Sequence, residues 1–225
     1  MKVYKYRSNY KRDLENLLNG KIYTSNMAGL NDPFEGIITP KIFEDYETIK
    51  SYFDPKQFEY KISLHKKLID QIKNVGIYSL SKTWKKELLW SHYSDSHKGF
   101  CIEYEINDLI LEESKSIIFP KIINVNYLKE PPIYSLQDSD NLDYKILQTL
   151  AGTKSKPWKY EKEIRIIFME YGEKKINTNA IISIIFGLHA SDEDINHTMK
   201  LLEYNIKYYK IELQKNSYKL TRKRI

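Results

Sequence analysis

The chain has 225 residues and a mass of 26.9 kDa, with 41 % hydrophobic and 29 % charged residues, which is enough for one well-buried domain and too little for two. Its eight glycines and seven prolines are spread along the chain, and this composition excludes intrinsic disorder and collagen-like or proline-rich repeats. The 36 basic and 30 acidic residues give a formal net charge of +6, but the lysines are scattered among acidic residues, so charge alone does not indicate a nucleic-acid-binding protein. We expect a single domain over residues 1–218 and a solvated basic tail over 219–225.

Hydropathy and cysteine content favour a cytoplasmic protein with no membrane partner. No apolar run approaches the roughly 20 residues that a membrane span needs, and residues 1–5 lack the apolar stretch of a secretory signal. The single cysteine, Cys101, excludes an internal disulfide framework and every multi-cysteine zinc or iron–sulfur motif. Because Cys101 lies in an apolar, strand-like segment, we expect a buried small hydrophobic residue rather than a nucleophile.

The first part of the chain predicts strands that alternate with helices. Leucines recur at i, i+3 and i+4 before Gly20, which suits a helix C-terminus. Asp32 before Pro33 predicts a turn, because proline restricts the preceding residue to extended conformations. A second helical repeat stops at Gly76. The expected elements are a strand at 4–6, a helix at 13–20, a strand at 21–25, a loop from 31, a helix at 56–75 and a strand at 77–81.

The second part of the chain mixes the two types without a regular order. Pro131 and Pro132 predict an exposed loop, and Ser191 followed by Asp194 resembles a capping box that opens a helix. The expected elements are strands at 99–105 and 117–127, a loop at 129–140, a helix at 142–150, strands at 163–170 and 181–186, a helix from 191 to about 205, and strands at 208–213 and 218–220. This order favours an α+β domain with two small packed β-sheets and flanking helices over a doubly wound parallel sheet. We expect the strand from Glu163 to lie beside the first strand or the strand at Ser79.

Several common catalytic motifs are absent from the sequence. There is no Gly-x-Gly-x-x-Gly, Walker loop, His-Glu-x-x-His or Gly-x-Ser-x-Gly, which disfavours dehydrogenases, P-loop ATPases and zincins. His92 and His97 lie five residues apart with no third ligand in view, so we expect no metal site. The candidate chemistry therefore lies in polar clusters beside strands. These clusters are residues 6–8, 31–35, 79–81, 90–93 and 158–165.

Arginine is scarce, with five residues against 31 lysines, so it is expected where its rigid two-pronged guanidinium is required. Arg7, at the end of the first strand, is a candidate clamp for a phosphate or carboxylate, with a structural salt bridge as the equal alternative. Arg165 is expected to pair with Glu161, Glu163 or Glu35.

Glu161 and Glu163 lie two apart at the entry to a strand, so both carboxylates point to one face and can line one pocket. Their mutual repulsion predicts a raised pKa for one of them, which suits a pair that stabilises a cation and handles a proton. The simpler alternative is a solvated strand edge. His92 is a candidate hydrogen-bonding group or general acid, with a structural role as the alternative.

Taken in order, these clusters resemble a widespread bacterial family of unknown function, DUF2971. The resemblance rests on short motifs spread from residue 4 to about 213. They are Tyr4-Lys5-Tyr6-Arg7, Asn31-Asp32-Pro33-Phe34-Glu35, Ser79-Leu80-Ser81, Trp90-Ser91-His92-Tyr93, His97-Lys98-Gly99-Phe100 and Trp158-x-Tyr160-Glu161-x-Glu163-x-Arg165. Because the function of this family is unknown, the resemblance does not indicate an activity.

A second resemblance implies an activity. Arg on the first strand, Ser-x-Ser on a middle strand and Glu-x-Glu on a late strand is similar to the order in arginine-serine-glutamate ADP-ribosyltransferases, which implies a split sheet and NAD as substrate. Arg7 would hold the phosphate side of NAD, Ser81 the nicotinamide ribose, and Glu163 the oxocarbenium-like transition state. Glu161 would activate a protein or nucleic-acid acceptor, as in a toxin or phage-defence effector. The residues assigned to NAD binding are Tyr6, Arg7, Asn31, Glu35, Ser81 and Tyr93, and those assigned to catalysis are His92, Glu161 and Glu163.

Two alternatives stay open. Glu35, His92 and Glu161 could instead form an acid–base or metal-assisted site that hydrolyses a nucleotide or nucleic acid. The clusters could also bind a nucleotide-like ligand without catalysis, as a sensor. In either case we expect the turn at 31–35 to present Glu35 near Arg7 or His92.

Overall fold

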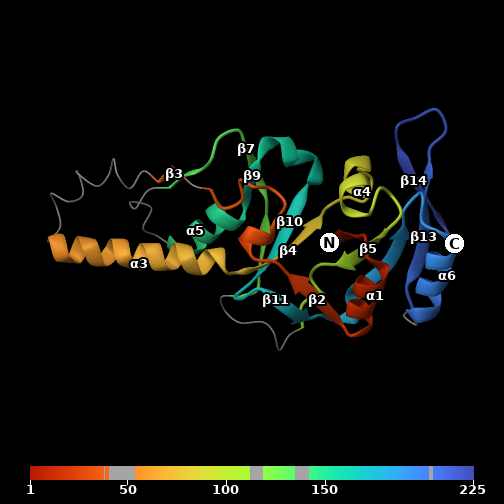
Figure 1. Ribbon diagram of the computed structural model, residues 1–225, viewed down its shortest axis with the longest axis horizontal. Helices are drawn as coiled ribbons and strands as arrows, with labels where there is room; N and C mark the ends of the chain where they lie inside the picture. The colour runs from red at the N-terminus through yellow and green to blue at the C-terminus, as the bar shows by residue number, and fades with distance from the viewer. Residues whose placement is uncertain (38, 41–53, 112–118, 135–141, 203–204) are drawn as a thin grey trace.

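The computed structural model describes residues 1–37, 39–40, 54–111, 119–134, 142–202 and 205–225 (Figure 1). Helices and strands are mixed irregularly within these ranges, which confirms the α+β class. The largest sheet among the described residues has eight strands, in the order β14 (Leu220–Arg224), β13 (Lys207–Leu213), β12 (Ile181–Phe186), β5 (Phe100–Glu105), β1 (Lys2–Arg7), β4 (Gly76–Ser81), β10 (Glu163–Phe168) and β6 (Lys121–Asn124). Neighbouring strands are antiparallel, except that β12 and β13 are parallel.

Three further sheets of two strands each lie within the described ranges. They pair β2 (Lys21–Thr24) with β11 (Gly172–Lys175), β3 (Thr39–Pro40) with β8 (Ile133–Tyr134), and β7 (Asn126–Leu128) with β9 (Thr153–Ser155). The β7–β9 pair matters for the pocket described below, because β9 carries Lys154, whose side chain contacts Glu163 at the start of β10.

The eight-stranded sheet is divided between β1 and β4. These two strands share a single Cα pair, Tyr4 with Ser81, whereas β1 pairs with β5, and β4 with β10, over six residues each. Beyond Tyr4, side-chain contacts replace the ladder, and the Lys5 ammonium donates to the Ser79 carbonyl oxygen at 2.8 Å. Instead of the two small packed sheets expected from the sequence, the protein therefore has one sheet in two halves, of five and three strands.

Helices cover both faces of the divided sheet (Figure 1). The α-helices of the described ranges are α1 (Tyr10–Leu18), α3 (Pro55–Lys73), α4 (Glu87–Tyr93), α5 (Leu142–Ala151) and α6 (Asp192–Leu201), and the 3₁₀ helices are η1 (Met27–Gly29), η3 (Lys156–Glu161) and η4 (Thr178–Ala180). Because strand side chains alternate between faces, Ile166 packs in the core under α1 and α6, while Ile167 packs against α5 and the end of α3. On that second face, α4 covers the five-stranded half. Within the same described ranges, no helix combines the length and apolar character that crossing a bilayer requires.

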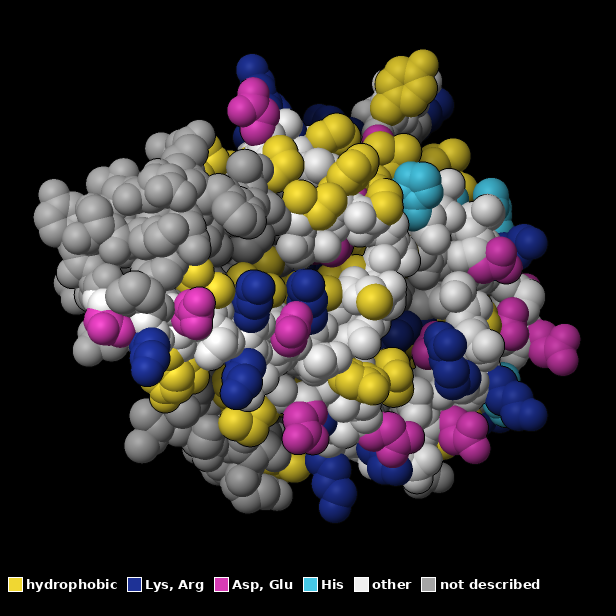
Figure 2. Space-filling model, turned by 60° about the vertical axis from the view of Figure 1, so that its left-hand side comes forward, with side chains coloured by type: hydrophobic (Ala, Val, Ile, Leu, Met, Phe, Trp, Pro, Cys, Tyr) yellow, Lys and Arg dark blue, Asp and Glu magenta, His cyan; other side chains and the backbone are white. Residues whose placement is uncertain are grey.

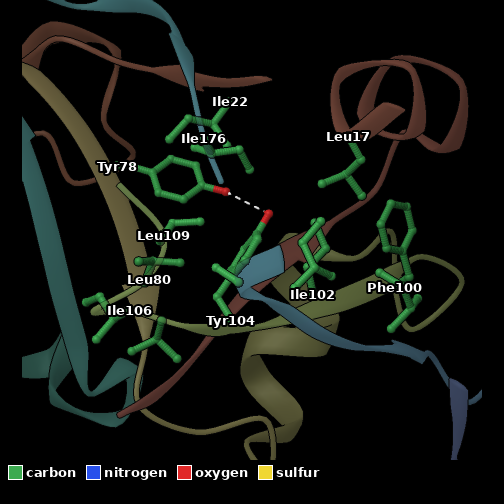
Figure 3. Close-up of a cluster of buried hydrophobic side chains, with 14 of the residues drawn as sticks. Leu17, Ile22, Tyr78, Leu80, Phe100, Ile102, Tyr104, Ile106, Leu109 and Ile176 are labelled. Carbon is green, nitrogen blue, oxygen red and sulfur yellow. Dashed lines mark hydrogen bonds between the residues drawn. The ribbon is translucent and has the colours of Figure 1, made fainter. Parts of the chain in front are cut away.

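The core under α1 and α6 reaches the division between the two halves of the sheet. Figure 3 shows Tyr78 of β4 and Tyr104 of β5 pointing toward each other, with their hydroxyl oxygens 3.4 Å apart. The Tyr78 hydroxyl also accepts from Nη2 of Arg7 at 3.4 Å. A polar contact thus extends from the otherwise apolar core to the base of the split.

Most predicted elements are present with shifted ends. The first helix begins at Tyr10 because Asn9 caps it, accepting from the backbone N–H of Arg12 at 3.0 Å. The strand from Glu163 lies beside β4, with Arg165 opposite Ser79, as expected. The strand predicted at 117–127 is two strands, β6 and β7, and the loop predicted at 129–140 includes β8. Residues 117–118, 135–140 and 203–204 of these predictions lie outside the described residues.

The basic C-terminal segment is not a solvated tail as expected, because residues 220–224 form β14 at the edge of the sheet. Arg222 explains the difference. Its Nη1 lies 3.0 Å from Oε2 of the buried Glu103, and its guanidinium stacks over Trp84 and Tyr209, at 5.1 and 4.3 Å from the ring centroids. Burial raises the pKa of Glu103, but hydrogen bonds from Ser183 and Lys2 and the charge of Arg222 lower it more, so the carboxylate stays ionised. β14 is therefore held at the edge of the sheet by the ion pair between its Arg222 and the buried carboxylate of Glu103.

Replacing Arg222 with alanine should lower the free energy of unfolding by about 1–3 kcal/mol, because Glu103 stays buried with Ser183, Lys2 and Tyr4 as its remaining partners. Urea unfolding followed by circular dichroism measures the loss. Arg224→Ala, an exposed position on the same strand, is the matched control and should change stability by less than about 0.5 kcal/mol. Equal losses in the two variants would contradict the role assigned to Arg222.

Candidate functional site

A pocket of about 500 Å³ opens where β1 and β4 separate. It brings together every residue that the sequence assigned to a site, namely Tyr6, Arg7, Asn31, Glu35, Ser81, His92, Tyr93, Glu161 and Glu163. Its wall also contains charged residues that sequence reasoning did not assign to binding or catalysis, namely Lys5, Arg12, Asp13, Lys154 and Arg165. Opposite charges gather in two regions of this wall, which we call the carboxylate end and the cationic end.

The carboxylate end is organised around the buried ammonium of Lys154, which β9 supplies. Its Nζ lies 2.7 Å from Oε2 of Glu161, 3.2 Å from Oε2 of Glu163 and 3.8 Å from Oε1 of Glu35. The ring of Trp158 covers the ammonium at 4.7 Å from the ring centroid. A buried ammonium needs such partners, because removing an unpaired charge from water costs several kcal/mol. Lys154 thus fixes three carboxylates that come from distant parts of the chain.

Arg165 is the second cation of the carboxylate end and is fully buried. It binds Glu35 through two hydrogen bonds, of 2.9 Å from Nη1 and 2.5 Å from Nη2, and Glu163 through Nε at 2.8 Å. Nη1 also donates to the Ala151 carbonyl oxygen at 2.7 Å. The predicted pairing of Arg165 with glutamates is confirmed. Glu35, expected near Arg7 or His92, lines the same pocket as both but is bound by Arg165.

Glu161 and Glu163 share the pocket for a reason that the strand pattern did not predict. Glu161 ends η3 rather than lying on a strand, and Lys162 after it is left-handed, with φ of 49°. The Glu161 carbonyl oxygen accepts from the Ser81 hydroxyl at 2.7 Å, and the Glu163 N–H donates to the Tyr127 hydroxyl at 2.7 Å. A turn held by hydrogen bonds, not β alternation, aims both carboxylates at Lys154.

At Glu163, the neighbouring cations affect the pKa more than repulsion between carboxylates does. Burial raises the pKa of Glu163, but Arg165 and Lys154 outweigh burial and lower it to about 2, so the sequence-based expectation of a raised pKa is wrong for this residue. Burial raises the pKa of Glu35 above its ordinary value even though Arg165 binds it. Glu163 is therefore ionised at every physiological pH.

Tyr93 and His92 enter the pocket from α4. The Tyr93 hydroxyl donates to Oε1 of Glu161 at 2.6 Å, and burial together with this hydrogen bond raises the pKa of Tyr93. The His92 side chain is exposed, with its ring centroid 6.1 Å from that of Tyr93. Among the described residues no hydrogen bond links His92 to Glu35 or Glu161, the partners that the hydrolase alternative gave it.

The cationic end is formed by β1 and the start of α1. Arg7 lies beside the Tyr78 ring, and its Nη1 is 3.8 Å from Oδ1 of Asp13, which Arg12 binds at 3.0 Å. Burial and the neighbouring charge of Arg7 lower the pKa of Lys5 to about 7. Three cations therefore face one carboxylate, which makes this end suited to an anion. The alternation in residues 4–7, which places Lys5 and Arg7 on one side of β1, is the signal that would have identified Lys5.

Within the described residues, no three His, Cys, Asp or Glu side chains are grouped closely enough to hold a metal ion. The three glutamates of the carboxylate end are instead held by the side chains of Lys154 and Arg165.

The fold and pocket define an α+β protein with a charged pocket in a split sheet. Residues 89–166 match the model of a family described as protein of unknown function (DUF2971), and this match supports the resemblance drawn from the short motifs. The matched region includes both cations and two of the three carboxylates of the carboxylate end. No curated protein and no solved structure matches the chain.

Replacing Glu163 with glutamine should lower stability by about 3 kcal/mol at pH 7, since its pKa falls from 4.5 to about 2 on folding. A lowered pKa contributes stability above about pH 4.5 and loses it as pH falls toward 2. The difference between wild type and Glu163→Gln should therefore close over that interval, as measured by urea unfolding at a series of pH values. The exposed Glu173→Gln is the control and should show no such convergence. A difference independent of pH would contradict the ion pairing.

Proposed function

We propose that the protein binds NAD in this pocket and transfers its ADP-ribosyl group to an acceptor, with release of nicotinamide. The observation that supports the proposal most is the convergence of Arg7, Ser81 and Glu163, which come from three different strands, on one pocket. The volume of about 500 Å³ lies within the roughly 300–1,000 Å³ usual for pockets that bind small molecules and cofactors.

The polarity of the pocket supports a ligand with separated charges. When Lys5 is protonated, the three cations and one carboxylate of the cationic end sum to +2. With all three glutamates ionised, the carboxylate end sums to −1, because Lys154 and Arg165 leave one negative charge uncompensated. NAD carries a doubly negative diphosphate and a positive nicotinamide ring. Its phosphates suit the cationic end and its nicotinamide riboside the carboxylate end.

Each residue has a chemical task in this arrangement. Arg7 binds a phosphate through its two-pronged guanidinium, and Ser81 lies beside the nicotinamide ribose. As the bond from the anomeric carbon to the nicotinamide nitrogen breaks, its electron pair stays with the nitrogen and positive charge grows on the ribose. Glu163, ionised and buried, stabilises that charge where the surroundings screen it least. Glu161 accepts the proton of the incoming nucleophile.

A second candidate function, binding without catalysis, is favoured by the ion pairs of Glu163. Both oxygens of Glu163 lie within 3.2 Å of a cation. Its Oε1 accepts a hydrogen bond from Arg165, and its Oε2 accepts from Lys154 and Arg165. A carboxylate so fully compensated can serve chiefly to hold the pocket in shape around a nucleotide. The two functions differ in what the loss of this charge does to turnover.

Glu163→Gln should reduce the rate of nicotinamide release by about a hundred- to a thousandfold while changing NAD affinity little, because the charge acts on the transition state. Arg7→Lys should weaken NAD binding by about tenfold, since an ammonium cannot make the paired contact. Chromatography of released nicotinamide and titration calorimetry measure the two effects.

The control for these variants is Arg224→Lys on β14, outside the pocket, and circular dichroism establishes that each variant is folded. Unchanged NAD affinity in Glu163→Gln, together with a wild type that releases no nicotinamide, selects the binding function. A wild type that neither binds NAD nor releases nicotinamide contradicts both.

NAD affinity should fall by about three- to tenfold between pH 6 and 8, because the Lys5 amine, with a pKa of about 7, loses its charge in this interval and a bound diphosphate favours the charged form. Lys5→Arg, which stays charged, should bind with little change over the same range. The two affinity profiles are measured by calorimetry in matched buffers. Parallel profiles would show that Lys5 does not contact the phosphates.

A further inference from the structure

Two adjoining segments form a rim beside the carboxylate end, and their lysines have no role in the proposed NAD site. One is residues 82–86, after β4, and the other is residues 156–162, which contain η3. The backbone N–H of Lys82 donates to the Lys162 carbonyl oxygen at 3.0 Å. The neighbouring Ser81 hydroxyl donates to the Glu161 carbonyl oxygen at 2.7 Å. The segments therefore lie side by side at the edge of the pocket. We call them the lysine–aromatic rim.

The rim concentrates positive charge, although basic and acidic residues are scattered among each other along the sequence. On the face drawn in Figure 2, basic and acidic side chains lie among one another. The rim carries six lysines, Lys82, Lys85, Lys86, Lys156, Lys159 and Lys162. Five of them are exposed and Lys86 is half-buried, and none forms an ion pair with another described residue. The rim's own carboxylate, Glu161, is buried and turned toward Lys154, so it does not neutralise the surface.

Aromatic rings accompany this charge on both sides of Glu161. Trp158 and Tyr160 of η3 are half-buried, with ring centroids 6.1 Å apart and planes inclined by 34°. On the other side, α4 contributes Tyr93, held to Glu161 by its 2.6 Å hydrogen bond, and the exposed His92. Flat rings next to point charges are the combination with which proteins bind single-stranded nucleic acids, because bases stack on the rings and phosphates pair with the lysines.

We infer that the lysine–aromatic rim binds single-stranded nucleic acid and presents one of its bases to the carboxylate end as the acceptor. A duplex would keep its bases stacked on each other, away from the rings, and an acidic peptide would use the lysines but leave the rings without a partner. Point charges and aromatic rings carry no base-specific donor pattern, so binding is sequence-tolerant.

The acceptor role rests on the proposed transferase function, whereas binding does not. In the transfer, a nucleophilic nitrogen or oxygen of the base forms the new bond to the anomeric carbon. Nicotinamide leaves with the electron pair of the broken carbon–nitrogen bond, and the proton of the nucleophile passes to Glu161. Tyr93 and Lys154 hold that carboxylate at the border between rim and pocket.

The test is fluorescence anisotropy with a labelled single-stranded RNA or DNA of about 12 nucleotides, without NAD, over roughly 50–200 mM salt. Binding should weaken with salt with a slope of about −0.7 per phosphate contact. Lys156→Glu combined with Lys159→Glu should lower affinity at least about tenfold and reduce the slope by about 1.4. The matched control, Lys207→Glu with Lys223→Glu at the far edge of the sheet, also changes the net charge from +6 to +2 and should bind much as wild type does.

Trp158→Ala separates stacking from charge. It should weaken binding by about five- to 150-fold at an unchanged salt slope. Absent binding, equal losses in the rim and control double variants, or polyglutamate binding that matches the nucleic acid and is indifferent to Trp158→Ala, would each overturn the inference. Nucleic-acid binding without nicotinamide release refutes the proposed transfer but leaves the rim as a binding surface. Nicotinamide release without nucleic-acid binding refutes the rim alone.

Discussion

The buried ion cluster of Lys154 and Arg165 with three glutamates is the interaction on which the pocket depends. Its members come from the loop after η1, from β9, from η3 and from β10, so charge compensation joins segments that are distant in the sequence. Neither cation can leave without exposing carboxylates to an uncompensated interior. The charges that hold the wall together thus also set the electrostatic potential inside the pocket.

The division of the sheet supplies the space that this cluster borders. A continuous ladder between β1 and β4 would fill the site with backbone hydrogen bonds, whereas the single pair at Tyr4 and Ser81 lets the strands separate and leaves Lys5 and Arg7 lining the pocket. The Tyr78–Tyr104 hydroxyl pair meets Arg7 at the base of this opening. A chain of polar contacts, from Tyr104 through Tyr78 to Arg7, therefore connects the apolar core with the pocket.

Local patterns predicted the elements well, because alternation and helical spacing record which face each residue buries. They also predicted the pairing of Arg165, since a scarce arginine on a strand between isoleucines requires a buried acidic partner. They failed where a contact joins distant segments. Lys154 is one lysine among 31, and nothing near it in the sequence marks it as the centre of the cluster. The basic C-terminal segment was misassigned for the same reason, because the partner that orders it, Glu103, lies 119 residues away.

The burial of the ion cluster has a consequence for how the protein responds to its ionic surroundings. Dissolved ions screen exposed charges over about 8–10 Å at ordinary ionic strength but screen buried pairs much less. Lys154 and its partners are at most 6 % exposed, so the field at the carboxylate end is set by covalently attached charges and is nearly constant. Most lysines of the lysine–aromatic rim, by contrast, are exposed to solvent, where dissolved ions screen their charges. A change in cellular salt would therefore alter what reaches the pocket while leaving its internal electrostatics unchanged.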